Sequence, residues 1–160
     1  MKRYLWGALA VALLTIAVTA SAEHQDDALL RFDHMIGVSG PYVGPNNPIR
    51  GVPGGNAAWV IREGRGELKL SGELEVHVRG LVLPSFGGIN VVPNIRGLVS
   101  CQIIDGAGNP GILNVSTGDF PFSQSGDADI EAQVALPNSC IAPVIFVTHP
   151  EGRWFATIGY

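Results

Sequence analysis

The sequence predicts an all-β protein, an antiparallel β-sandwich or small barrel of about eight or nine short strands. Apolar and polar residues alternate over several segments, as they do in half-buried strands, whereas a helical period is almost absent. Glycine and proline, 21 and 11 of the 160 residues, gather between those segments. Such clusters are typical of turns and loops, so we expect short strands joined by long Gly/Pro-rich loops.

An export signal begins the chain. A basic start is followed by an almost unbroken apolar run over residues 4–18 and by small residues before Glu23. The run has about 15 residues, whereas a membrane-spanning helix needs about 20. The sequence therefore predicts a cleaved signal peptide of residues 1–22 and a single domain of residues 23–160. We expect the product to be secreted or periplasmic, with no membrane span after cleavage.

The exported part is acidic. The chain has 10 Lys and Arg against 14 Asp and Glu, and Lys2 and Arg3 leave with the signal peptide. An acidic surface repels the phosphates of nucleic acids and anionic membrane surfaces. We therefore expect neither as a partner. Which ligand or envelope component the protein meets, and in which oligomeric state, the sequence leaves open.

Cys101 and Cys140 are the two cysteines, and both adjoin strand-like segments. An even number of cysteines in an exported protein favours a disulfide. Their spacing is not that of a redox pair, and neither has a neighbouring histidine that would indicate a metal site. We predict a structural Cys101–Cys140 disulfide, worth on the order of 4 kcal/mol in the chain-entropy account.

The individual strands differ in clarity. Alternation is clearest in residues 128–136, which Pro137 ends, and in a C-terminal hairpin with a Pro/Gly turn at residues 149–152. Residues 28–38 fit a strand or an amphipathic helix, and we favour the strand. The predicted strands are residues 28–38, 59–63, 97–104, 112–116, 128–136, 141–148 and 153–160, with a further hairpin over residues 67–78.

The hairpin over residues 67–78 has a predicted register. A three-residue loop after Leu70 would pair Leu70 with Leu74 on the inner face. The same register would set Glu67 opposite His77 on the outer face. Both cross-strand pairs are favourable, so we expect this register.

Two Gly/Pro-rich segments, residues 37–56 and 84–93, do not follow the strand pattern. Loops of this length are uncommon in compact domains and are usually functional or disordered. Binding residues often lie on long loops of a rigid scaffold. We therefore predict binding through the loops of residues 37–56 and 84–96. The candidate binding residues are Tyr42, Asn46, Arg50 and Arg96.

Other side chains form no recognisable catalytic or metal motif. The four histidines lack metal-ligand spacing. Asp127, Asp129 and Glu131 share one strand face, but no calcium-binding loop surrounds them. No nucleophile elbow occurs either. The sequence thus predicts no catalytic residue, no metal and no cofactor.

Short runs stand out at residues 47–51, 59–61, 78–82, 99–101, 126–132, 136–137 and 140–143. Asn47-Pro48-Ile49-Arg50-Gly51 and Val99-Ser100-Cys101 are among them. In these runs the chain resembles a group of small secreted bacterial β-domain proteins with one disulfide, for which no activity is established. The resemblance implies secretion and a β fold, and no catalytic role carries over from it.

Taken together, the sequence predicts a secreted or periplasmic, non-enzymatic β-domain that binds a ligand or serves the cell envelope or matrix. One alternative is a metal- or carbohydrate-binding module, in which His77 or the face of Asp127 to Glu131 would bind a metal. A second is a small secreted hydrolase, since catalytic carboxylates are paired only by the fold.

Overall fold

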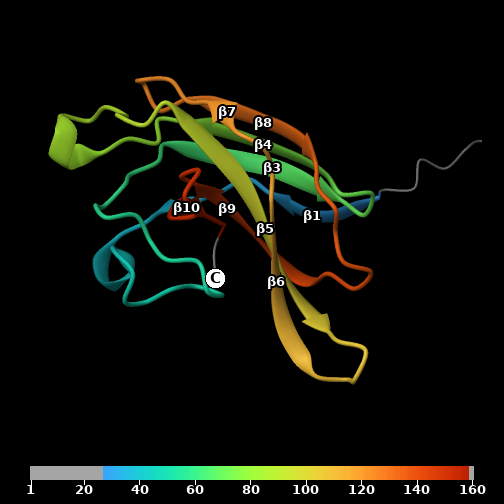
Figure 1. Cartoon of the computed structure of the whole chain (residues 1–160). Coiled ribbons are helices and arrows are strands. Elements are labelled where there is room, and N and C mark those ends of the chain that lie inside the picture. The colour runs from blue at the N-terminus through green and yellow to red at the C-terminus, as the bar shows by residue number, and fades with distance from the viewer. Residues whose placement is uncertain (1–26, 159–160) are drawn as a thin grey trace, which may run out of the picture.

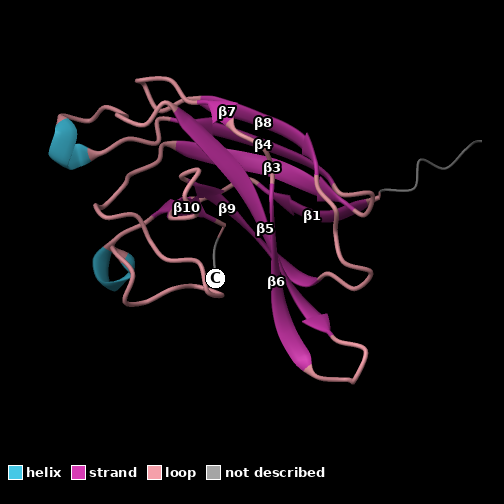
Figure 2. Cartoon of the chain, viewed as in Figure 1, coloured by secondary structure: helices cyan, strands magenta, loops and turns pink. Residues whose placement is uncertain are grey.

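The computed structural model describes residues 27–158, so the predicted signal peptide of residues 1–22 lies outside them. Two antiparallel sheets pack face to face, accompanied by the short 3-10 helices Gly40–Tyr42 and Pro84–Phe86 (Figure 1, Figure 2). The predicted all-β sandwich is confirmed, with ten strands in the described residues instead of eight or nine. Within residues 27–158, no helix is long and apolar enough to cross a bilayer.

One sheet has four strands, in the spatial order β1-β3-β4-β8. The other has six, in the order β2-β10-β9-β5-β6, with β7 also paired to β5. The pairings between these strands are antiparallel. The strands are β1 Ala28–Phe32, β2 Ile36–Gly37, β3 Glu63–Lys69, β4 Glu73–Arg79, β5 Asn94–Ile104, β6 Pro110–Ser116, β7 Phe120–Pro121, β8 Ala128–Gln133, β9 Ile141–Thr148 and β10 Trp154–Thr157.

The ambiguous segment of residues 28–38 forms two strands that belong to different sheets. β1 pairs with β3 in the four-stranded sheet, and β2 pairs with β10 in the six-stranded sheet. Met35, between them, is buried, and a Cβ at Gly64 of β3 would lie 2.6 Å from Met35 Cγ. The strand prediction is confirmed, and Met35 marks the point where the chain changes sheets.

The β3–β4 hairpin forms, but the predicted register is wrong. Its three-residue turn lies one position earlier, so Glu67 lies opposite Glu75 instead of His77. Leu70 is consequently in the turn and 66% exposed. Gly72 explains the position of the turn: its φ is 89°, and a Cβ there would lie 2.2 Å from a neighbouring carbonyl oxygen. This place in the turn requires glycine.

Residues 59–63, predicted as one strand, instead cross from one sheet to the other. The Trp59 N–H donates to the Val38 carbonyl next to β2, whereas the Arg62 N–H donates to the Arg79 carbonyl at the end of β4. A segment that changes partners along its length does not continue a single ladder. For this reason β3 begins only at the end of the predicted strand.

The core lies between the sheets. Leu74 and Val76 of β4 and Ile130 of β8 are fully buried. Gly97 of β5 faces this group, because a Cβ at Gly97 would lie 3.0 Å from Leu74 Cδ2 and 3.4 Å from Ile130 Cγ2. The missing side chain lets β5 approach the opposite sheet closely.

The Gly/Pro-rich segment of residues 37–56 covers the side of the six-stranded sheet that faces away from the four-stranded sheet (Figure 1). Val52 is buried, and Gly54 forms a β-bridge with Trp154 of β10. A Cβ at Gly54 would lie 1.8 Å from the Tyr42 carbonyl oxygen, so backbone packs on backbone here. This cover explains why the second half of β9 is buried on both faces.

The predicted disulfide is confirmed. Cys101, buried in β5, is bonded to Cys140, which directly precedes β9, with a Cα–Cα distance of 4.8 Å and a sequence separation of 39. The pairing between β5 and β9 shifts its register between Ser100 and Gln102. The disulfide therefore ties the two strands together where their ladder is irregular.

Candidate functional site

The side chains of Arg50 and Arg96 bind different partners. The Arg50 Nη1 donates to the Ser100 carbonyl at 3.0 Å. Arg96, on β5 itself, forms an ion pair with Asp119 through its Nε. Arg96 and Ser100 are four residues apart on one strand, which corresponds to about 13 Å. The two guanidinium groups thus bind separate partners, the Ser100 carbonyl and the Asp119 carboxylate.

The local backbone directs Arg50 toward β5. Arg50 and Gly51 have φ of 50° and 80°, and the flanking Ile49 and Val52 exchange backbone hydrogen bonds of 3.1 and 2.9 Å. Positive φ at both central residues is typical of a type I′ turn. The Arg50 carbonyl also accepts a hydrogen bond from the Asn114 side chain at 3.1 Å. The turn is therefore attached to β5 and β6 through Arg50.

The other two predicted residues lie elsewhere in the same loop. Tyr42 is half-buried, and its ring centroid lies 6.4 Å from that of Trp154. Asn46 is exposed. Neither of them, nor Arg50 or Arg96, lines the groove over β1, β3 and β4 or the cavity between Trp59, Phe86 and Phe155. That these four residues bind a ligand stays a prediction.

The acidic strand face considered for a metal has basic partners. Asp129 Oδ1 accepts a hydrogen bond from Arg79 Nη2 at 2.7 Å and lies 2.7 Å from His77 Nδ1. The hydrogen bond from His77, and to a smaller extent the one from Arg79, lowers the pKa of Asp129. The hydrogen bond to Asp129 in turn raises the pKa of His77. Among residues 27–158, no group of three His, Cys, Asp or Glu side chains is placed to hold a metal ion.

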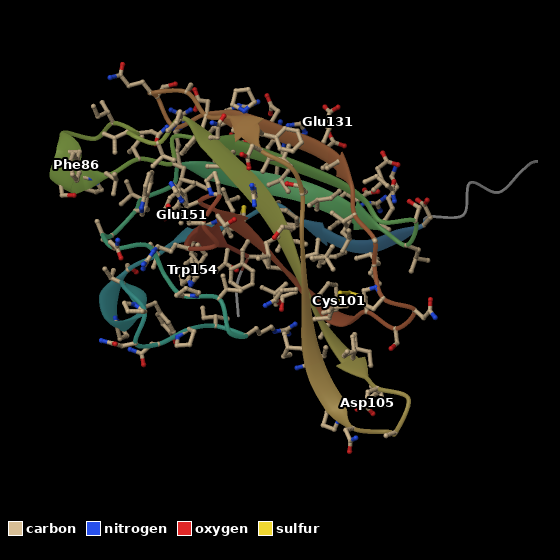
Figure 3. All side chains as sticks on the ribbon, in the orientation of Figure 1. Phe86, Cys101, Asp105, Glu131, Glu151 and Trp154 are labelled. Carbon is tan, nitrogen blue, oxygen red and sulfur yellow. A yellow bond between two sulfur atoms is a disulfide. The ribbon has the colours of Figure 1, made fainter. Side chains whose placement is uncertain are left out.

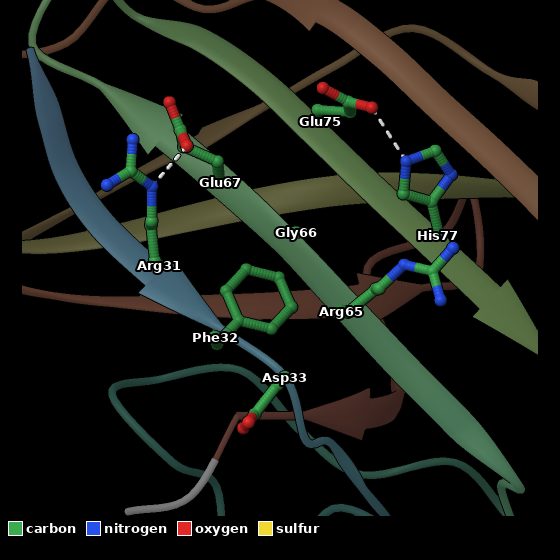
Figure 4. Close-up of a pocket in the computed structure, with 8 residues that line it drawn as sticks. All are labelled: Arg31, Phe32, Asp33, Arg65, Gly66, Glu67, Glu75 and His77. Carbon is green, nitrogen blue, oxygen red and sulfur yellow. Dashed lines mark hydrogen bonds and ion pairs between the residues drawn. The ribbon is translucent and has the colours of Figure 1, made fainter. Parts of the chain in front are cut away.

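A groove of about 520 Å³ runs over β1, β3 and β4 (Figure 4). The Phe32 ring lies beside Gly66, where a Cβ would be 2.8 Å from Phe32 Cζ, so the glycine makes room for the ring. Two charged pairs flank the ring, each with a 2.6 Å contact: Arg31 with Glu67, and His77 with Glu75. A ring among paired charges offers an apolar face next to hydrogen-bonding groups.

A second cavity, of about 290 Å³, lies where three segments far apart in the sequence meet; we call it the end pocket. Trp59 and Phe155 are only 4% and 5% exposed, and their rings stack with centroids 4.2 Å apart. Phe86 and Val91, 56% and 52% exposed, also line it. Its apolar lining comprises Ala57, Trp59, Leu83, Phe86, Val91, Val92 and Phe155.

Two consecutive glycines present Phe86 to solvent. Gly87 and Gly88 have φ of 75° and 74°, and a Cβ on either would meet no atom within 4 Å. The Leu83 carbonyl accepts hydrogen bonds from the N–H groups of Phe86 and Gly88, which closes the turn. Figure 3 shows Phe86 at the end of the molecule opposite Asp105.

Polar groups of the β9–β10 turn complete the end pocket. The Arg153 guanidinium donates to the Asn56 side chain at 2.9 Å. The His149 Nδ1 accepts the Glu151 N–H at 3.1 Å, so the neutral imidazole carries its proton on Nε2. The His149 ring also meets the edge of Phe155, with centroids 6.0 Å apart. The pocket therefore combines an aromatic floor with a cation, a carboxylate and an imidazole.

None of the end-pocket residues is a binding candidate from the sequence alone, although Phe86 and Val91 lie in the loop predicted to bind. The signal in the sequence that indicates such a pocket is the presence of apolar residues in a Gly/Pro-rich loop. Trp59 is 4% exposed, and one side of its ring lines this cavity.

Comparison with protein-family models, with curated proteins and with solved structures gives no match.

Proposed function

We propose that this is an exported, non-enzymatic binding protein whose end pocket holds a small apolar group of its ligand. The observation that carries the proposal is the convergence of exposed Phe86 and Val91 over the stacked rings of Trp59 and Phe155. Concave, mostly apolar sites with a few polar groups are typical of ligand pockets. Loops at the end of a rigid sandwich are a common place for them.

The chemistry of the lining favours binding over covalent catalysis. None of the described residues that line the end pocket is a Ser, Thr, Cys, Lys or Tyr, which leaves Glu151 and His149 as the nucleophile types present. His149 and Glu151 are adjacent, but Nδ1 of His149 accepts a backbone N–H, with Glu151 Oε2 3.8 Å away. Arg153 supplies a positive charge, whereas the Glu151 carboxylate is 78% exposed and screened by solvent, so a ligand with an apolar body and an anionic group fits best.

Two fluorescent probes test the proposal on the chain from Glu23 onward. 8-Anilinonaphthalene-1-sulfonate is apolar and anionic, and N-phenyl-1-naphthylamine is apolar and neutral. We expect Phe86→Ala to weaken the binding of both probes about tenfold. The variant loses the contact between probe and phenyl ring, and this loss is worth about 1.5 kcal/mol. Arg153→Gln is expected to weaken only the anionic probe.

Ile104→Ala is the matched control. Ile104 is 52% exposed, close to the 56% of Phe86, but it lies at the tip of the β5–β6 hairpin. The control should bind both probes as the unmodified chain does. Equal weakening by Phe86→Ala and Ile104→Ala, or no probe binding at all, would contradict the proposal.

Carbohydrate binding in the groove of Figure 4 is the second candidate, favoured by the position of the Phe32 ring between charged pairs. Aromatic faces stack on sugar rings while the flanking charges bind hydroxyls. In a screen of soluble oligosaccharides, Phe32→Ala would then abolish binding and Phe86→Ala would not. The reverse result assigns the sugar to the end pocket.

A further inference from the structure

β6 forms an open edge of the six-stranded sheet (Figure 1). The Thr117 N–H donates to the Gly97 carbonyl, and the Asp105 N–H donates to the Asn109 carbonyl. The backbone N–H and C=O groups of the odd-numbered residues of β6 therefore point toward β5. In an antiparallel ladder the alternate residues point the other way. The backbone N–H and C=O groups of Ile112, Asn114 and Ser116 therefore point to the open side of β6.

This edge lacks the features that usually keep sheet edges apart. Residues 106–118 include no charged side chain, and Pro110, the single proline among them, stands at the first position of β6. The β5–β6 pairing runs without a register shift, so no bulge twists the edge away. Natural edge strands are normally protected by charge, proline or a bulge. An unprotected edge is therefore a place where another strand adds.

Apolar side chains are exposed on the same hairpin and beside it. Ile104 and Ile112 are 52% and 44% exposed, Leu113 is 40% exposed, and Ile141 at the start of β9 is 47% exposed. Exposed apolar side chains gathered in this way mark interaction surfaces. A strand added to β6 would cover Ile112 and Leu113.

The open residues of β6 are arranged symmetrically around Asn114. An antiparallel copy of β6 centred on Asn114 would set Ile112 opposite Ser116 of the second copy and Leu113 opposite Val115 of the second copy. All outward-facing backbone groups of Ile112, Asn114 and Ser116 would then be paired. Since β6 is uncharged, two copies of an acidic protein meet here without opposing like charges.

We propose that two copies of this chain associate by antiparallel pairing of β6 with β6 about a two-fold axis at Asn114, which joins their six-stranded sheets. The Asn114 side chain binds the Arg50 carbonyl on its own copy. Side chains stand perpendicular to the sheet, so this contact leaves the backbone edge open. The interface is isologous and closed, because the open edge of each β6 is paired with the other and a third copy cannot add to it.

Sedimentation equilibrium of the oxidised chain from Glu23 onward tests the association. We expect a mass of two chains at high concentration that falls to one chain on dilution. Ile112→Lys places a charge on the edge and should raise the dissociation constant at least tenfold. Leu70→Lys, at the 66% exposed Leu70 in the β3–β4 turn, adds the same charge and should leave the dissociation constant unchanged.

A cysteine at the axis tests the register. Paired residues in a hydrogen-bonded position have Cα atoms about 5.5 Å apart, within disulfide reach. Asn114→Cys should therefore give a covalent dimer under mild oxidation, whereas Ser85→Cys, exposed at the other end of the sandwich, should not. A single-chain mass at every concentration, equal effects of the two lysine variants, or equal cross-linking of the two cysteine variants would overturn the proposal.

Discussion

The imidazole of His77 on β4 bridges two carboxylates: Nδ1 lies 2.7 Å from Asp129 of β8, and Nε2 lies 2.6 Å from Glu75. Arg79 donates to the same oxygen of Asp129. Arg65 lies opposite His77 on β3. A polar row thus runs across the outer surface of the four-stranded sheet, and its stability contribution depends on the charge of His77.

The first prediction concerns pH. The hydrogen bond to Asp129 raises the pKa of His77 above its ordinary 6.5, so the contribution of His77 is complete below pH 6.5. It is lost as pH rises through the folded pKa. The same contacts lower the pKa of Asp129 below 3.8, so its contribution is complete above that value and lost as pH falls through the folded pKa.

We therefore expect His77→Gln to be less stable than the unmodified chain at about pH 5 and nearly as stable at about pH 9. The difference at pH 5 should be below about 1 kcal/mol, because the pair is partly exposed to solvent. Urea unfolding at the two pH values measures it. A stability difference that is the same at both would show that the charge of His77 contributes nothing.

The second prediction concerns the Cys101–Cys140 disulfide. Replacing both cysteines by alanine should lower the free energy of unfolding by about 4 kcal/mol, because the unfolded chain regains the entropy of a loop closed over a sequence separation of 39. Urea unfolding of the variant and of the reduced chain measures this loss. Equal transition midpoints for the oxidised and reduced chains would contradict it.

The third prediction concerns the loop of residues 37–56 as a cover of the six-stranded sheet. Gly54→Ala should destabilise the fold by about 1–3 kcal/mol, because its Cβ would lie 1.8 Å from the Tyr42 carbonyl oxygen. Gly106→Ala is the control, since a Cβ at Gly106 meets no atom within 4 Å. Thermal unfolding followed by near-ultraviolet circular dichroism compares them. Equal stability of the two variants would mean that the loop does not pack as described.

The fourth prediction separates stability from binding at the arginines. Arg50→Ala removes a charged donor from the Ser100 carbonyl and should cost about 1–2 kcal/mol of stability, whereas Arg96→Ala loses a partly exposed ion pair and should cost less than about 1 kcal/mol. Neither should change naphthylamine binding in the end pocket. Weaker probe binding by Arg50→Ala or Arg96→Ala at unchanged stability would instead support the loop as a binding surface.

Local patterns in the sequence determined the fold class, the disulfide and the approximate position of most strands. Alternation and turn residues act over a few positions, and two cysteines have one way to pair within a chain. The β3–β4 register was predicted incorrectly because Gly72 abuts the Val134 carbonyl, a contact with a segment more than 60 residues away. Sequence spacing carries no information about such a neighbour.

Tertiary structure alone decided which surfaces are covered and which are open. The loop of residues 37–56 packs on the six-stranded sheet, and the end pocket arises because Trp59, Phe86 and Phe155 come from segments that meet only in the folded sandwich. Burial and concavity depend on contacts between residues distant in the chain. The sequence by itself therefore determined a disulfide-linked β-sandwich, whereas packing between distant segments decided where a ligand or a second copy finds room.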